Sequence, residues 1–167
     1  MEIGLLLVRV VVGALLVGHG AQKLFGSFGG YGVAGTGGWF ESIGFRPGRA
    51  MAVVAGLSEL VGGLLLVLGL LTPLASAAIV GTMVVAASTH AASGLWNTGG
   101  GYELPLVLAV VGATVALTGP GAYSLDAVLG LQLSPVVGLG AIALGVLAAL
   151  VVVARARTAV RSVPAAA

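Results

Sequence analysis

The sequence contains no cysteine and few charged residues. With no cysteine among 167 residues, disulfide exchange, thiolate catalysis and cysteine-ligated iron–sulfur clusters are excluded. Only 7% of the residues are Asp, Glu, Lys or Arg, whereas soluble domains carry about 25%. Seven basic and five acidic residues leave a formal charge of +2, which is too small for a nucleic-acid-binding surface. The composition therefore points away from soluble and nucleic-acid-binding proteins.

Hydrophobic residues make up 59% of the chain and fall in long runs. Five runs approach the roughly 20 apolar residues that a helix needs to cross a bilayer. They are residues 3–24, 50–71, 73–92, 103–118 and 136–154. Residues 36–45 place Trp39 and Phe40 beside Glu41, a pattern typical of a short amphipathic helix in the membrane interface. The sequence therefore predicts an all-α integral membrane protein with a short interfacial helix after the first of five spans.

The basic residues predict the orientation of the chain in the membrane. Most of them fall near span ends that would share one membrane face: Lys23, Arg46, Arg49, Arg155, Arg157 and Arg161. Lys and Arg are in excess at the cytoplasmic ends of membrane helices. We therefore expect the N-terminus outside the cell and the C-terminus inside, with residues 156–167 as a basic cytoplasmic tail.

Polar side chains gather at the same face of the predicted bundle. With a rise of about 1.5 Å per residue, Glu59 lies roughly 13 Å below this face and His19 about 7 Å below it. Ionisable groups at such depths are costly and usually mark a site or a pathway. The candidate quinone and proton site comprises His19, Gln22, Lys23, Glu59, His90, Asn97, Tyr102 and Glu103.

Glu59 is the most costly of these residues, because a buried carboxylate must pair with a cation or take up a proton. Arg9 and His19, both on the first span, are its candidate partners. Such a pair would either hold the first two spans together or carry protons beside a ligand pocket. His19 and His90 also allow a second interpretation, as the axial ligands of a haem. No other metal site is predicted.

Six short motifs follow one another along the first three quarters of the chain. They are an Arg-x3-Gly pair in the first span, HGAQKLFG (19–26), GGYGVAGTGGWFESIGF (29–45), LSELVGGLLLVLGLLT (57–72), NTGGGYELPL (97–106) and GPGAYSLD (119–126). Their order and spacing resemble those of the DoxX family of small bacterial membrane proteins. The resemblance implies a four-helix membrane core in residues 1–130, to which residues 131–155 add a fifth transmembrane helix. The family's last motif usually has Arg where this chain has Ala122.

The resemblance also implies a redox role. The family is named from a subunit of a thiosulfate:quinone oxidoreductase, so we expect a bacterial inner-membrane subunit of a redox complex that is associated with the quinone pool. We expect no covalent cofactor, because the sequence carries no flavin, iron–sulfur or nicotinamide motif. The expected partners are membrane lipid and other membrane subunits. The alternative is a non-catalytic structural or assembly subunit, whose glycine-rich faces and extra helix dock onto a larger complex.

Overall fold

The computed structural model describes residues 2–131 and 134–161, and none of these residues forms a β-strand. The long helices are α1 (Glu2–Phe25), α3 (Gly48–Leu68), α4 (Thr72–His90), α5 (Glu103–Thr118) and α7 (Pro135–Arg161). The shorter elements are α2 (Gly32–Ser42), α6 (Leu125–Val128) and three 3-10 turns at Ser27–Gly29, Ala91–Ser93 and Asn97–Gly99. The protein is an all-α bundle, as the sequence predicts.

Each of the five predicted spans forms a helix. Among the described helices, α1, α3, α4 and α7 are long and apolar enough to cross a membrane. Helix α5 has 16 residues, so at about 1.5 Å per residue it covers about 24 Å. That length is slightly less than the roughly 30 Å thickness of the hydrocarbon core. The chain is a multi-pass membrane protein whose outer faces contact lipid.

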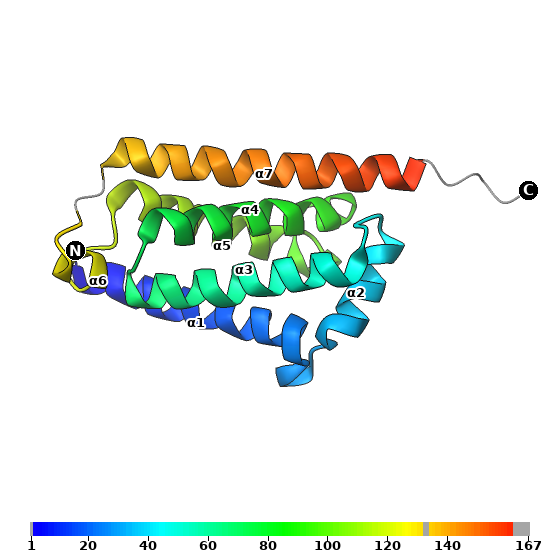
Figure 1. Cartoon of the computed structure of the whole chain (residues 1–167), viewed down its shortest axis with the longest axis horizontal. Helices are drawn as coiled ribbons and strands as arrows, with labels where there is room; N and C mark the ends of the chain where they lie inside the picture. Colours follow the sequence, from blue (N-terminus) through cyan, green and yellow to red (C-terminus); the bar gives the residue numbers. More distant parts are fainter. Residues whose placement is uncertain (1, 132–133, 162–167) are drawn as a thin grey trace, which may run out of the picture.

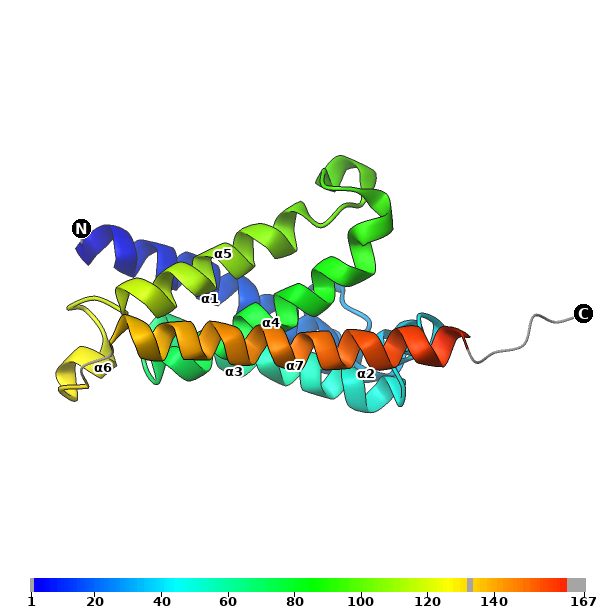
Figure 2. The same cartoon turned by 90° about the horizontal axis from the view of Figure 1, so that it is seen from above.

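Successive long helices run in opposite directions, so the start of α1 and the end of α7 lie at opposite ends of the bundle (Figure 1). Helix α1 packs along α3, while α4 packs against α3, α5 and α7. Figure 2 shows α7 lying along the bundle and α4 and α5 inclined to it. Helix α2 packs across the end of α1 and the start of α3. We call this the α2 end of the bundle, and the opposite end, which contains α6, the α6 end.

The structure changes the bounds of three predicted elements. Helix α3 ends at Leu68 rather than at residue 71 because Gly69 has a φ of +60°, the left-handed conformation that commonly ends helices. Helix α2 spans Gly32–Ser42 rather than residues 36–45. Helix α7 continues to Arg161, so residues 156–161 of the predicted tail are helical. Residues 162–167 of the predicted tail lie outside the described residues.

Helix α2 and the loop that follows it pack partly inside the protein. Phe40 of α2 and Phe45 of the loop are buried with Ala52 of α3 and Ala156 of α7. This contact with the last turns of α7 gives a physical reason for that helix to continue beyond the apolar run. Part of the amphipathic pattern in residues 36–45 therefore reflects packing against neighbouring helices rather than against lipid.

Glycines spaced seven residues apart bring α1 and α3 into close contact. They are Gly13 and Gly20 on α1 and Gly56 and Gly63 on α3. A Cβ atom at Gly20 would lie 2.6 Å from the backbone N of Leu60 and 2.7 Å from the O of Gly56. A Cβ at Gly63 would lie 2.6 Å from the O of Gly13. Seven residues are almost two helical turns, so each glycine pair lies on one face of its helix and allows the backbones to touch.

We predict that Gly20→Ala destabilises the protein in detergent by about 1–3 kcal/mol, because the added methyl group overpacks a backbone contact. Gly18 is the matched control, since a Cβ there would meet nothing within 4 Å. Gly18→Ala should leave stability unchanged or raise it by up to about 1 kcal/mol through helix propensity. The midpoint of denaturant-induced unfolding measures both changes. Equal effects of the two substitutions would contradict the close contact.

Candidate functional site

Arg9 is buried at the α6 end, where it binds backbone carbonyl groups. Its side chain is 1% exposed. The guanidinium donates to the O atoms of Leu66 at 3.1 Å and Val67 at 3.0 Å, at the end of α3. It also donates to the O atoms of Tyr123, at 3.1 Å, and Pro120. The last carbonyl groups of a helix lack intrahelical partners and favour a cation. Arg9 therefore caps α3 and ties it to the segment after α5.

Asp126, which the sequence analysis assigned to no site, makes the complementary contact at the start of α4. It is completely buried. Its carboxylate accepts hydrogen bonds from the N–H of Leu71 at 2.8 Å, the N–H of Thr72 at 2.9 Å and the hydroxyl of Thr72 at 2.6 Å. A carboxylate stabilises the free N–H groups of a helix N-terminus. In the sequence, the feature that could have identified Asp126 is its position as the last residue of the GPGAYSLD motif.

The same motif is bound to the start of α1. Ala122, where the family motif usually has Arg, donates its backbone N–H to Glu2 Oε2 at 2.5 Å. Arg9, Asp126 and Glu2 thus hold the α3–α4 hairpin and the motif together. Neither of the two cavities described below is lined by these three residues. Their role in this structure is to fix the α6 end of the bundle.

At the α2 end, Lys23 and Glu59 form a salt bridge between α1 and α3. Lys23 Nζ lies 2.5 Å from Glu59 Oε2. The side chain of Glu59 is 4% exposed and that of Lys23 is 25% exposed. One N–H group of the Lys23 ammonium donates to this carboxylate. Its other two N–H groups have no acceptor in the described part of the chain. The pair therefore neutralises a carboxylate inside the bundle and keeps two donors free.

This salt bridge replaces the expected pairing of Glu59 with Arg9 or His19. Cα–Cβ bonds tilt toward the N-terminus of their helix. Because α1 and α3 are antiparallel, Lys23 and Glu59 lean toward each other, whereas Arg9 and Glu59 lean apart. Arg9 instead reaches Leu66 and Val67, seven or eight residues beyond Glu59. The prediction of an Arg9–Glu59 ion pair was therefore wrong.

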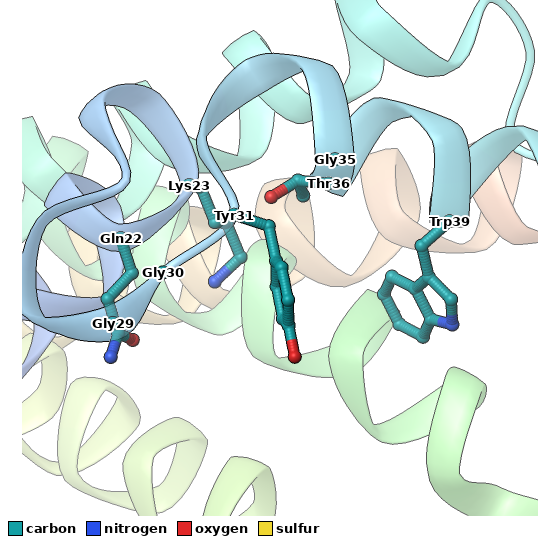
Figure 3. A pocket seen from close by; sticks show the side chains of 8 residues that line it. All are labelled: Gln22, Lys23, Gly29, Gly30, Tyr31, Gly35, Thr36 and Trp39. Atoms are coloured by element: carbon teal, nitrogen blue, oxygen red, sulfur yellow. The ribbon is translucent and has the colours of Figure 1, made fainter.

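One cavity, here called the α1–α2 cavity, lies between the end of α1, the turn after it and α2. It has a volume of about 580 Å³. It is lined by Gln22, Lys23, Gly29, Gly30, Tyr31, Gly35, Thr36 and Trp39. Figure 3 shows the rings of Tyr31 and Trp39 projecting to the same side, with the amino group of Lys23 on the Gln22 side of Tyr31.

A second cavity, here called the α3–α7 cavity, lies over α4 between α3 and α7. Its volume is about 370 Å³, and Trp39, Phe40 and Phe45 line it at the α2 end. Its polar lining residues are Lys23, Ser58, Glu59, Thr82, Thr89 and His90. Mostly apolar pockets of about 300–1,000 Å³ with a few convergent polar groups are typical of small-molecule sites. Lys23 and Trp39 line both cavities, so they lie at the boundary between the two.

Two hydroxyl groups on the wall of the α3–α7 cavity lack the intrahelical hydrogen bond that several other hydroxyls make. Hydroxyl groups of Ser and Thr within apolar helices commonly donate to a carbonyl of the preceding turn. Ser88, Thr89, Thr114 and Thr118 do so here. In the described part of the chain, the hydroxyls of Ser58 and Thr82 have no hydrogen-bond partner. Among the described residues, the buried hydroxyl of Ser76, outside the cavity lining, also has no partner. The hydroxyls of Ser58 and Thr82 are available to a ligand, and sequence reasoning missed both of them.

The hydrogen bond of His90 determines which of its ring nitrogens remains available to a ligand. Its Nδ1 lies 3.0 Å from the O of Gly100. A carbonyl oxygen only accepts hydrogen bonds, so Nδ1 carries the proton and Nε2 of the neutral ring is an acceptor. His90 also lines the α3–α7 cavity. The cavity thus combines the donors of Lys23, a carboxylate and an imidazole acceptor from three different helices.

The remaining candidate residues are not brought into the α3–α7 cavity. The Nδ1 of His19 is 3.2 Å from Gln22 Oε1, and Gln22 lines only the α1–α2 cavity. The N–H of Asn97, in the segment between α4 and α5, donates to Oε2 of Glu103 at the start of α5 at 3.0 Å. His19, Asn97, Tyr102 and Glu103 are absent from the linings of both cavities. Similar depth in the membrane did not mean convergence on one site.

The two histidines offer no support for a haem. His90 lines the α3–α7 cavity, whereas His19 bonds to Gln22 and lines neither cavity. Two axial ligands must face one porphyrin-sized space. Among the described residues, no three His, Asp or Glu side chains group as they would around a metal ion.

We predict that Lys23→Met destabilises the protein by about 2–3 kcal/mol, because it leaves the Glu59 carboxylate buried without its cation. The double variant Lys23→Met/Glu59→Gln should recover most of this loss, since it removes both charges. Denaturant unfolding of the four members of this double-mutant cycle measures the coupling. Strictly additive effects would contradict a direct pair.

Comparison with known proteins gives one match. The sequence model of the DoxX family matches residues 4–92, more than half of the chain. The matched region includes α1 to α4, with Arg9, Lys23, Glu59 and His90, and ends before α5 and α7. No curated protein and no solved structure matches the chain. By this match over more than half of its sequence, the chain belongs to the DoxX family.

Proposed function

We propose that this chain is the quinone-binding membrane subunit of a redox complex in a bacterial inner membrane. One observation carries the proposal. The α3–α7 cavity brings Lys23, Glu59 and His90, from three different helices, to one mostly apolar space. A quinone head group requires such a space, together with hydrogen-bonding groups for its oxygens.

The polar groups suit both redox forms of a quinone. The oxidised form presents carbonyl oxygens that accept hydrogen bonds, and the free N–H groups of Lys23 and the hydroxyls of Ser58 and Thr82 can donate to them. The reduced form presents hydroxyl groups, and the Nε2 of His90 and the carboxylate of Glu59 can accept their protons. Because donors and acceptors line the same cavity, the chain can hold the substrate in either form.

We further propose that a partner subunit supplies the group that exchanges electrons with the quinone. The sequence has no cysteine for an iron–sulfur cluster. The residues that line the cavity bind, orient and exchange protons, which are functions that complement an electron donor. The basic α2 end, with Arg46, Arg49, Arg155 and Arg157 exposed, favours a cytoplasmic position for this end and an outside position for the N-terminus.

The alternative of a purely structural subunit depended on glycine-rich faces that dock onto other chains. Many of the glycines in the spans contact helices of this same chain: Gly13, Gly20, Gly56, Gly63, Gly81, Gly138 and Gly145. The fifth helix, α7, packs against α4 and α5. These contacts leave fewer small-residue surfaces for docking, and they therefore favour the ligand-binding proposal.

Tryptophan fluorescence offers a direct test of quinone binding. Trp39 lines the cavity and the chain has only one other tryptophan, Trp96. In a Trp96→Phe background, a benzoquinone added to the purified full chain in lipid nanodiscs should quench the fluorescence of Trp39. We predict that Glu59→Gln and His90→Ala each weaken binding about tenfold, because the first replaces a charged acceptor by a weaker neutral one and the second removes the imidazole acceptor.

Matched controls lie outside the cavity lining. Glu103→Gln makes the same chemical change as Glu59→Gln at the first residue of α5, and His19→Ala matches His90→Ala. Both controls should bind quinone as the parent protein does. The proposal fails if the parent protein shows no saturable quenching at membrane-like quinone concentrations. It also fails if Glu59→Gln and Glu103→Gln have equal affinities.

A further inference from the structure

The α3–α7 cavity opens on the side of the bundle. Helix α4 forms its floor, and α3 and α7 form its two walls. Three lining residues are exposed at the outer surface: Trp39 at the α2 end, Val54 on α3, which is 57% exposed, and Ala148 on α7. Of these, Val54 and Ala148 belong to the two walls. The cavity mouth therefore lies between two helices, each long and apolar enough to cross a membrane.

The height of this mouth places it among lipid chains. Val54 lies five residues from Arg49 along α3, and Ala148 lies seven residues from Arg155 along α7. At about 1.5 Å per residue, both are roughly 8–10 Å from these basic residues. Exposed Arg side chains favour the headgroup level, so the mouth opens below it, toward hydrocarbon. A ligand that enters here must dissolve in the bilayer.

Aromatic residues and a salt bridge border the α2 end of the same cavity, where the ring of Trp39 is exposed. Phe40 and Phe45 pack with Ala52 and Ala156 and join α2 and its loop to α3 and α7. Lys23 and Trp39 form the boundary with the α1–α2 cavity. A molecule from the aqueous side thus faces the aromatic residues and the salt bridge, whereas a molecule in the lipid faces valine and alanine.

We propose that the ligand enters laterally from the bilayer between α3 and α7, and that its apolar tail passes between Val54 and Ala148 into the lipid. The polar ring then lies by Lys23, Glu59 and His90, while the tail remains in hydrocarbon. The occupant is a prenyl-tailed quinone rather than a water-soluble ring compound. This inference rests on the proposed quinone site and adds to it the class of substrate and its route.

The structure also gives α7 a role. It lies outside the region matched by the family model, yet Gly145, Ala148, Ala149 and Val152 line the cavity. Gly145 packs tightly against α4, because a Cβ there would lie 2.5 Å from the O of Ala77. Helix α7 therefore supplies one side of the mouth, and its small residues determine how wide a tail can pass.

The test compares two benzoquinones with the same ring, one with a prenyl tail and one without. Binding to the full chain in nanodiscs is followed by Trp39 quenching. Two separate variants, Ala148→Phe and Val54→Trp, should each weaken binding of the tailed quinone about tenfold. Because Val54→Trp adds a tryptophan, its binding is measured by competition with a labelled quinone. Binding of the tail-less quinone should change by less than about twofold, which also reports that each variant is folded.

The controls are Ala143→Phe on α7 and Val61→Trp on α3, both at exposed positions outside the cavity lining. Neither should change the affinity for either quinone. Equal weakening of both quinones by the mouth variants, or no weakening of the tailed one, would overturn lateral entry. Lateral entry would also be overturned if native mass spectrometry found a phospholipid bound in the α3–α7 cavity that tailed quinone did not displace. If the parent protein binds neither quinone, the proposed function itself fails.

Discussion

The contact between α1 and α3 at Gly13, Gly20, Gly56 and Gly63 is the constraint on which the rest of the structure depends. In lipid, apolar side chains gain little by leaving the bilayer for a helix interface, so close van der Waals packing must hold helices together. Side chains at these positions would separate the two backbones. The same contact fixes the antiparallel register that brings Lys23 to Glu59 and Arg9 to the end of α3.

The buried charges are distributed so that each has a partner of its own. Arg9 is bound by backbone carbonyl groups, Asp126 by backbone N–H groups and a hydroxyl, and Glu59 by Lys23. Removing one partner from such a pair leaves an uncompensated charge in a medium of low dielectric. The two capping interactions stabilise the α6 end, while the Lys23–Glu59 pair lies at a cavity. A chain with so few charged residues thus places some of them where helices are capped and one pair at the wall of a cavity.

The family motifs and the added helix contribute different parts of the site. Lys23, Glu59 and His90 lie on α1, α3 and α4, within the region matched by the family model. The opposite wall comes from α7, which is rich in small residues at the cavity. The polar chemistry is therefore supplied by the shared core, and the shape of the cavity also depends on a helix outside the matched region.

The sequence by itself determined the fold class and the five helices. In hydrocarbon, an apolar run of about 20 residues satisfies its backbone hydrogen bonds only as a helix or in a closed barrel. It also placed Lys23 and His90 near one membrane face, with Glu59 deeper in the membrane on the same side. Only the tertiary structure decided that Glu59 pairs with Lys23 and that Asn97 and Glu103 bind each other away from the cavities. It also decided that the hydroxyls of Ser58 and Thr82 find no partner among the described residues. The physical reason is that a sequence reports depth along each helix, whereas contacts depend on register, rotation and side-chain direction, which helix packing sets.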